Sequence, residues 1–265
     1  MPAHKKKLSE KNLVVIKYKP IIPDLTGFSF KPMHKKIRFT DYQNSAVDKI
    51  STSMDKNEFR PFLLHGVTGS GKTEIYIEAA RHAINQGKTV IMLLPEIALT
   101  PQIAGRFKSV FGDKVAMWHS KLSQSARAWT WKRICAGDYK VVTGARSAVF
   151  SPLKNLGLIV VDEEQENSYK QESPAPRYHA REVSLMRGKI HNATVVLASA
   201  TPSLESYYNY INDKFEYIHL GGGMRIDYEH NNSKLNLRKY SKEDIAAGVQ
   251  KHCEDIVYKW IKYWI

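Results

Sequence analysis

The chain has 265 residues, of which 43% are hydrophobic and 25% are charged, and its formal net charge is +14 at pH 7. These proportions are ordinary for globular proteins and argue against a wholly disordered chain, a coiled coil or a collagen-like repeat. No apolar run approaches the roughly 18–20 residues of a membrane-spanning helix, and no apolar stretch follows the basic N-terminus to form a secretory signal. Two cysteines are too few for a disulfide framework or a four-cysteine zinc site. We therefore expect a soluble, intracellular protein with no zinc site and no membrane partner.

The sequence pattern divides the chain into three parts. Residues 1–38 form a basic arm or linker, residues 39–220 one folded domain, and residues 221–265 a divergent tail that begins with three glycines. Residues 1–40 hold ten Lys or Arg against two Asp or Glu. Such an arm suggests a polyanionic partner, because Lys and Arg release counterions from phosphates. A solvated, disordered tail would show the same run of charge.

Within residues 39–220, apolar strands alternate with helical patterns. The predicted strands, in chain order, are 61–65, 89–94, 115–118, 140–143, 156–161 and 193–198. The predicted helices are 41–54, 74–85, 101–111 and 123–135, and a long segment, 165–187, separates the last two strands. This alternation is typical of βαβ units, in which a parallel sheet is buried on both faces. We therefore predict an α/β fold with a doubly wound, mostly parallel sheet of these six strands.

The strongest motif is GVTGSGKT, which matches the phosphate-loop pattern G-x-x-x-x-G-K-[ST] and lies between a predicted strand and a predicted helix. Glycines let the backbone curl so that its amides point at phosphate, and the following helix adds its positive N-terminal end. Lys72 would neutralise the β- and γ-phosphates, and the Thr73 hydroxyl would be a ligand of Mg²⁺. The sequence thus predicts a nucleoside-triphosphate site formed by Gly66, Thr68, Gly69, Ser70, Gly71, Lys72 and Thr73.

Two acidic residues directly follow the apolar strand 156–161. This order places Asp162 and Glu163 at the carboxyl end of a buried strand, where ligands of open α/β sheets bind. Asp162 is suited to hold Mg²⁺ through its water shell, and Glu163 to accept a proton from the attacking water as a general base. Lys72, Asp162 and Glu163 are therefore the candidate catalytic residues, and together they predict hydrolysis of a phosphoanhydride.

Three further turns at strand ends are suited to contacts with phosphate. Ser199 and Thr201, in the segment SATPS, could sense the γ-phosphate through their hydroxyls. Thr100, in LLPEIALTPQ, and Arg146, in TGARSA, lie in strand-to-helix turns that suit a backbone phosphate of nucleic acid. Each turn alone is a weak signal, and their order along one sheet is what counts.

In this order, the motifs GVTGSGKTE, LLPEIALTPQ, TGARSAVFSPL, VVDEEQ and ASATPS resemble the first motor lobe of superfamily 2 DNA helicases. Matches between the motifs, such as Trp118-His119-Ser120 and Tyr169-Lys170-Gln171, bring the resemblance closest to the bacterial replication-restart helicases, the PriA family. The resemblance runs from Phe39 to Leu220, about two-thirds of the chain. It implies a RecA-like lobe that uses ATP and Mg²⁺, 3′-to-5′ unwinding of DNA, and a role in primosome assembly and in the restart of stalled replication forks.

The resemblance also implies roles for further residues. Gln43 falls where the family has a glutamine that reads adenine. Tyr169, Tyr178 and His179 fall in the family's aromatic-rich loop, where rings can stack on bases while cations meet phosphates; a surface loop with buried tyrosines is the alternative. The implied partners are single-stranded or branched DNA, single-strand binding protein and other primosome proteins, in the bacterial cytoplasm at the nucleoid.

Three features depart from the family pattern. Gln165 stands where the family usually has His, and it cannot carry a proton charge. Only about 40 residues precede the lobe, and neither the arginine motif of a second lobe nor zinc-site cysteines follow residue 203. Because an arginine finger accelerates hydrolysis by about 10³–10⁵, we expect the isolated chain to bind ATP weakly, hydrolyse it slowly and not unwind duplex DNA. Two alternatives stay open: another superfamily 2 DNA translocase, and a non-catalytic DNA- or partner-binding module with a relic phosphate loop.

Overall fold

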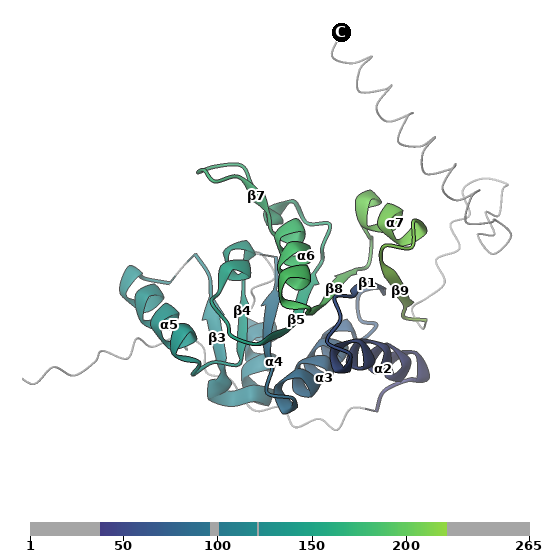
Figure 1. Ribbon diagram of the computed structural model, residues 1–265, viewed down its shortest axis with the longest axis horizontal. Helices are drawn as coiled ribbons and strands as arrows, with labels where there is room; N and C mark the ends of the chain where they lie inside the picture. The colour runs from purple at the N-terminus through teal and green to yellow at the C-terminus, as the bar shows by residue number, and fades with distance from the viewer. Residues whose placement is uncertain (1–37, 96–100, 121, 222–265) are drawn as a thin grey trace, which may run out of the picture.

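The computed structural model describes residues 38–95, 101–120 and 122–221 (Figure 1). The basic arm, the tail and Thr100 lie outside the described residues. Within the described part, none of the helices is both long enough and apolar enough to cross a membrane.

A seven-stranded sheet forms the centre of the fold, and all its strand pairs are parallel. In spatial order the strands are β3 (Val115–Trp118), β4 (Val141–Gly144), β2 (Thr89–Leu93), β5 (Leu156–Asp162), β8 (Thr194–Ser199), β1 (Pro61–His65) and β9 (Glu216–His219). The predicted α/β fold is confirmed, and each of the six predicted strands is present within one residue of its expected bounds. The sequence analysis missed β9, because this edge strand is short and polar at both ends, so it lacks the apolar run of the buried strands.

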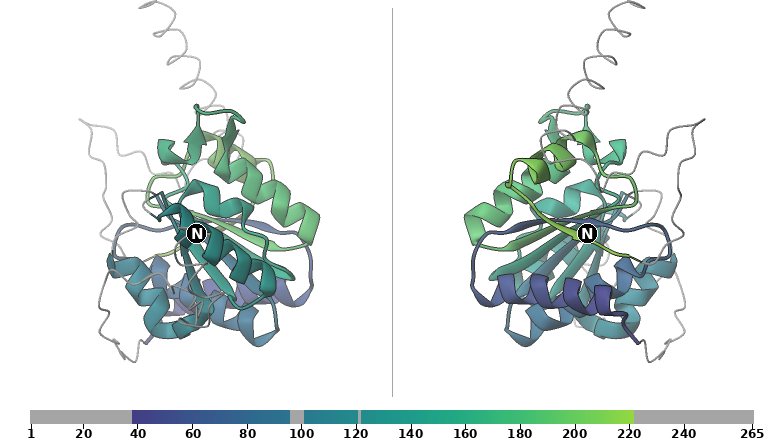
Figure 2. Two further views of the ribbon diagram at one scale, coloured as in Figure 1. Left: turned by 90° about the vertical axis from the view of Figure 1, so that its left-hand side faces the viewer. Right: turned by 90° about the vertical axis from the view of Figure 1, so that its right-hand side faces the viewer.

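Helices cover both faces of the sheet, as the two side views show (Figure 2). One face carries α2 (Asp41–Asp55), α3 (Lys72–Asn85) and α4 (Pro101–Phe111), followed by the 3₁₀ turn η1 (Gly112–Lys114). The other carries α5 (Gln124–Ala136), α6 (Ala180–His191) and α7 (Leu204–Ile211). Since successive strand residues point to opposite faces, Phe62 and Leu64 join one apolar cluster and Leu63 joins the other. This is why the inner strands are apolar throughout instead of alternating.

The segment 165–187 contains structure that the sequence analysis left undivided. It forms the 3₁₀ turn η3 (Asn167–Tyr169), a two-stranded hairpin of β6 (Lys170–Gln171) and β7 (Tyr178–His179), and the beginning of α6. Helix α6 buries small residues at a spacing of four, namely Ala180, Ser184 and Gly188. Small and polar residues on the buried side conceal the apolar periodicity by which a helix is recognised from sequence.

The order of the strands assembles the motifs at one edge of the sheet. Because the strands are parallel, their carboxyl ends meet at the same edge. The phosphate loop follows β1, the acidic pair ends β5, and the SATPS turn follows β8, which lies between β5 and β1. The 3₁₀ turn η2 (Arg146–Phe150) follows β4 at the same edge.

Candidate nucleotide and nucleic-acid site

The phosphate loop joins β1 to α3, and its shape depends on two glycines. Gly69 and Gly71 have φ angles of 82° and 86°, in the left-handed region that residues with side chains rarely adopt. The ammonium of Lys72 donates to the carbonyl oxygen of Gly66 at 2.7 Å, and this lysine is buried. Ser70 Oγ is also buried and has no hydrogen-bond partner among the residues that the structure describes. A phosphate would pair with the buried cation and accept a hydrogen bond from the hydroxyl, so the loop fits a nucleoside triphosphate.

Gln43, near the start of α2, contacts the phosphate loop directly. Its Nε2 donates to the Ser70 carbonyl oxygen at 2.9 Å, and its Oε1 accepts from the Thr40 backbone N–H at 2.8 Å. A side chain at Gly71 would clash with Gln43 Nε2, a second reason for glycine there. A primary amide has a second hydrogen on nitrogen and a second lone pair on oxygen, so Gln43 can still pair with the edge of a base.

Asp162, at the end of β5, is oriented by a tyrosine that the sequence analysis did not single out. Tyr76 Oη, in α3, donates to Asp162 Oδ1 at 2.9 Å, and the backbone N–H of Glu163 donates to the same oxygen at 3.1 Å. Burial raises the pKa of the Asp162 carboxyl, and the hydrogen bond from Tyr76 opposes this rise. In the sequence, Tyr76 could have been identified only by its spacing of four residues from Lys72, which places both side chains on the same side of α3.

The surroundings of Asp162 suit a magnesium ion that is shared with a nucleotide. Mg²⁺ keeps several waters and takes one or two protein carboxylates alongside substrate phosphates. Among the described residues, no group of three or more His, Cys, Asp or Glu is placed to enclose a metal. Both hydrogen bonds to Asp162 fall on Oδ1. Within the described part of the chain, Oδ2 is therefore the oxygen available to the ion's water shell, and Thr73 is the second residue of the adjacent helix α3.

A chain of polar contacts links the phosphate loop to the SATPS turn. Lys72 Nζ lies 3.6 Å from Glu163 Oε1, and Gln165 Nε2 donates to Glu163 Oε2 at 3.0 Å. Ser199 Oγ donates to Gln165 Oε1 at 2.6 Å and accepts from the backbone N–H of Thr201 at 2.8 Å. The fold thus brings four predicted residues together, and Gln165 bridges them with both ends of its amide.

Glu164 is a buried carboxylate that the sequence analysis missed. It is fully buried, and Arg181 Nη1 donates to its Oε2 at 3.0 Å. The backbone N–H of Ser203 donates to Oε1 at 2.7 Å, and Ser206 Oγ donates to Oε2 at 2.9 Å. The acidic turn is thereby tied to α6 and α7. Three consecutive carboxylates look alike in a sequence, and only the packing shows that Glu164 is fully enclosed whereas Glu163 is partly exposed.

The structure corrects the expectation for Tyr169 in the aromatic-rich loop. Tyr169 is 1% exposed, and its hydroxyl donates to the Asp162 carbonyl oxygen at 2.6 Å. Its ring lies in the apolar core beneath the acidic turn and is not available to stack on a base. Tyr178 is half-buried, with its ring edge-on to Phe150 at 4.9 Å between centroids. His179 Nδ1 accepts from the Arg181 backbone N–H, which caps α6.

Arg146, at the start of η2, connects the β4 turn to this hairpin. Its Nη1 donates to the carbonyl oxygens of Lys170 at 3.1 Å and Ser168 at 3.4 Å. The predicted phosphate-contacting arginine therefore lies where β6 begins.

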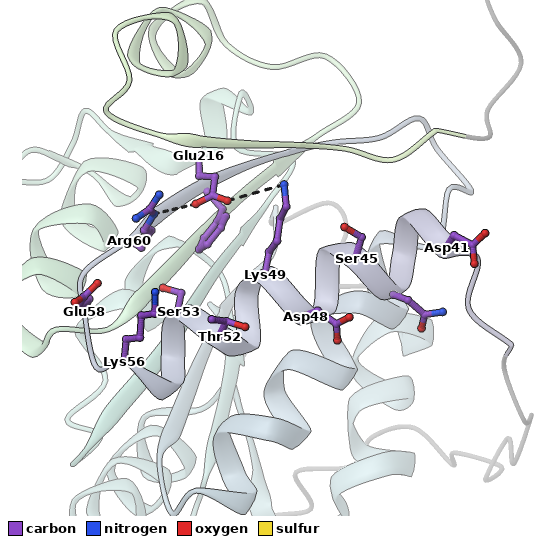
Figure 3. Close-up of a pocket in the computed structure, with 12 residues that line it drawn as sticks. Asp41, Ser45, Asp48, Lys49, Thr52, Ser53, Lys56, Glu58, Arg60 and Glu216 are labelled. Carbon is purple, nitrogen blue, oxygen red and sulfur yellow. Dashed lines mark hydrogen bonds and ion pairs between the residues drawn. The ribbon is translucent and has the colours of Figure 1, made fainter.

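A groove of about 600 Å³ lies away from the motifs, between helix α2 and strands β1 and β9 (Figure 3). Glu216 pairs there with Arg60 at 2.9 Å and lies 4.0 Å from Lys49 Nζ. Since its cations and carboxylates compensate one another, this lining does not indicate a phosphate site.

Comparisons with known proteins agree with this arrangement. The sequence pattern of DEAD/DEAH box helicases matches residues 40–210. The chain is 47% identical over 225 residues to Replication restart protein PriA of Chlamydia pneumoniae, an alignment that covers 84% of this chain and 30% of that protein. It is 46% identical over 202 residues to Replication restart protein PriA of Bacillus subtilis (strain 168), covering 76% of this chain and 25% of that protein. The chain thus spans less than a third of the length of these curated relatives.

Two solved structures share the fold. RecG bound to a three-way DNA junction matches with a TM-score of 0.51 and 20% identity, over 70% of this chain and 24% of that one. The UvsW helicase from bacteriophage T4 matches with a TM-score of 0.50 and 18% identity, over 74% of this chain and 64% of that one. At these identities the likeness concerns the fold alone.

Proposed function

The chain belongs to the DEAD/DEAH box helicase family, and from that premise we propose that it is the ATP-hydrolysing lobe of a PriA-like replication-restart helicase that acts on DNA. One observation carries the proposal: Lys72 Nζ lies 3.6 Å from Glu163 Oε1, beside the buried Asp162, where three turns meet at one sheet edge. The similarity to proteins named Replication restart protein PriA supports the assignment to replication restart.

In this proposal the residues of the sheet edge divide the work. The amides of the phosphate loop and Lys72 bind the phosphates of ATP, and Gln43 pairs with adenine. Mg²⁺, when bound, supplies positive charge to the phosphate oxygens. Asp162 would hold the ion through its water shell. Glu163 accepts a proton from the attacking water at its carboxylate, which the ion pair with Lys72 holds against the loop.

We further propose that the same edge contacts DNA. Arg146 is the phosphate-contacting cation, and Tyr178 and His179 are the ring-bearing residues of the hairpin next to it. Thr100, outside the described residues, remains a proposed phosphate contact. Ser199 and Thr201 would report the state of the nucleotide through Gln165, because these residues form one hydrogen-bonded chain with Glu163. Single-stranded or branched DNA is the proposed polymer, and primosome proteins are the proposed partners.

The test is nucleotide binding and ATP hydrolysis by the purified chain, with and without single-stranded DNA. Lys72→Ala is expected to abolish nucleotide binding. Glu163→Gln is expected to keep binding and to slow hydrolysis by about 10²–10⁴, the usual contribution of a general base. Glu78→Gln is the matched control, since Glu78 lies on the outside of α3 and pairs with Arg81.

Two results would contradict the proposal. One is nucleotide binding that survives Lys72→Ala. The other is a DNA affinity that nucleotide changes no more in the unaltered chain than in Lys72→Ala. That is the behaviour of a non-catalytic binding module.

A further inference from the structure

A small cleft lies at the ends of β3 and β4, beside the proposed DNA edge. It has a volume of about 130 Å³, and its polar lining includes Arg127, Arg146, Ser147 and Ser168. Of the lining residues, which all belong to the described part of the chain, none carries a carboxylate. A cleft with two guanidinium groups and no negative charge favours an anion.

The hydrogen bonds around the cleft leave donors for such a ligand. Arg127 donates through Nη2 to the Ser120 carbonyl oxygen at 2.7 Å, and Arg146 donates through Nη1 to two carbonyl oxygens. Each guanidinium has five N–H groups, so these contacts fix its position and use only part of its capacity. Ser168 Oγ is buried and has no partner in the described structure. An unsatisfied buried hydroxyl beside two arginines suits a phosphate oxygen.

Two indole rings, the partly buried Trp118 and the exposed Trp131, continue from this cleft. Trp118 Nε1 donates to Ser147 Oγ at 3.1 Å, and the Trp118 and Trp131 rings lie 5.2 Å apart between centroids at 50°. Arg127 and Trp131 are four residues apart on α5, so both lie on the same side of the helix, next to its buried residues Ala126, Thr130 and Ile134. Trp131 is 36% exposed. We call this cleft together with the two indoles the α5 surface.

We propose that the α5 surface binds single-stranded nucleic acid, with a backbone phosphate in the cleft between Arg127 and Arg146 and a neighbouring base against Trp131. Base-paired strands keep their base faces stacked inside the duplex, so an exposed ring next to a phosphate cleft selects an unpaired strand. The inference rests on the proposed function, because it extends the DNA path past the β4 turn onto α5.

The test is binding of dye-labelled oligothymidine to the 265-residue chain, measured by fluorescence anisotropy over a range of salt concentrations. Trp131→Ala is expected to weaken binding about tenfold, as the loss of one stacked base does, without changing the dependence on salt. Trp131→Phe should recover part of the affinity, because a ring remains. Arg127→Gln is expected to lower the slope of log K against log salt by about 0.7, the value for one phosphate contact on a single strand.

Tyr208→Ala is the matched control, since Tyr208 is an exposed aromatic residue on α7, and circular dichroism checks that each variant folds. Unchanged affinity in Trp131→Ala together with an unchanged salt slope in Arg127→Gln would overturn the proposal, even if Arg146→Gln still weakens DNA binding. If the unaltered chain binds no DNA, the proposed function fails first.

Discussion

At the scale of single residues, the candidate site depends on side chains that hold the catalytic candidates in place. Asp162 Oδ1 accepts from Tyr76, and the Asp162 carbonyl oxygen accepts from Tyr169. Both tyrosines are buried, and burial raises the pKa of each phenol well above its usual value. They therefore stay protonated and act as donors. Partners of this kind set the orientation of a metal-binding carboxylate.

We predict that Tyr76→Phe raises the Mg²⁺ concentration needed for nucleotide binding by about tenfold, because the carboxylate loses the donor that orients it. The measurement is binding of a fluorescent ATP analogue during a Mg²⁺ titration. Tyr169→Phe is the control, because it removes only the hydrogen bond to the Asp162 carbonyl oxygen and leaves the carboxylate contacts in place. An unchanged Mg²⁺ midpoint in Tyr76→Phe would show that the bond does not position Asp162.

At the scale of elements, the acidic turn after β5 joins parts of the fold that are distant in sequence. Glu164 receives hydrogen bonds from Arg181 at the start of α6 and from Ser203 and Ser206 at the start of α7. The hairpin β6–β7 ends at His179, two residues before Arg181. A displacement of the hairpin would therefore act on the residue next to Glu163, a physical route from the proposed DNA contact to the nucleotide site.

We predict that Glu164→Gln lowers the free energy of unfolding by about 1–3 kcal/mol, because Arg181 loses the fully buried one of its carboxylate partners and keeps only Glu182 and Glu205. Chemical denaturation measures this change. Glu166→Gln provides the comparison, since no ion pair is seen for Glu166 among the described residues. A loss no larger in Glu164→Gln than in Glu166→Gln would mean that the carboxylate contributes nothing as a charge.

At the scale of the whole molecule, packing leaves several histidines partly buried in different regions. Burial lowers the pKa of His65, at the end of β1, of His179, at the start of α6, and of His191, at its end. The neutral imidazole is thus favoured in the folded chain. Asp162 has the opposite effect, because burial raises the pKa of its carboxyl.

We predict that the free energy of unfolding falls as the pH is lowered from about 7 to about 5. In that range the unfolded chain, with histidine pKa values near 6.5, binds more protons than the folded chain, so acid favours unfolding. Denaturation midpoints measured across this range check the prediction. A midpoint that stays level or rises as the pH is lowered would refute it.

The amino-acid sequence by itself determined the parallel sheet and the phosphate loop. Both depend on local requirements: apolar runs for strands buried on two faces, and glycines at Gly69 and Gly71 for left-handed backbone angles. Edge strand β9 and helix α6 lacked such local signals.

Only the tertiary structure decided which side chains meet. Tyr76 and Asp162 are 86 residues apart and meet because α3 packs against β5. Gln165 and Ser199 are 34 apart and meet because β8 pairs with β5. The same packing buried Tyr169, for which the sequence analysis had left stacking on bases and burial in a surface loop as alternatives, and left Trp131 exposed beside a phosphate-sized cleft. The apolar periodicity of a segment shows which of its faces is buried. The order of the strands and the packing of the helices decide which residues that face contacts.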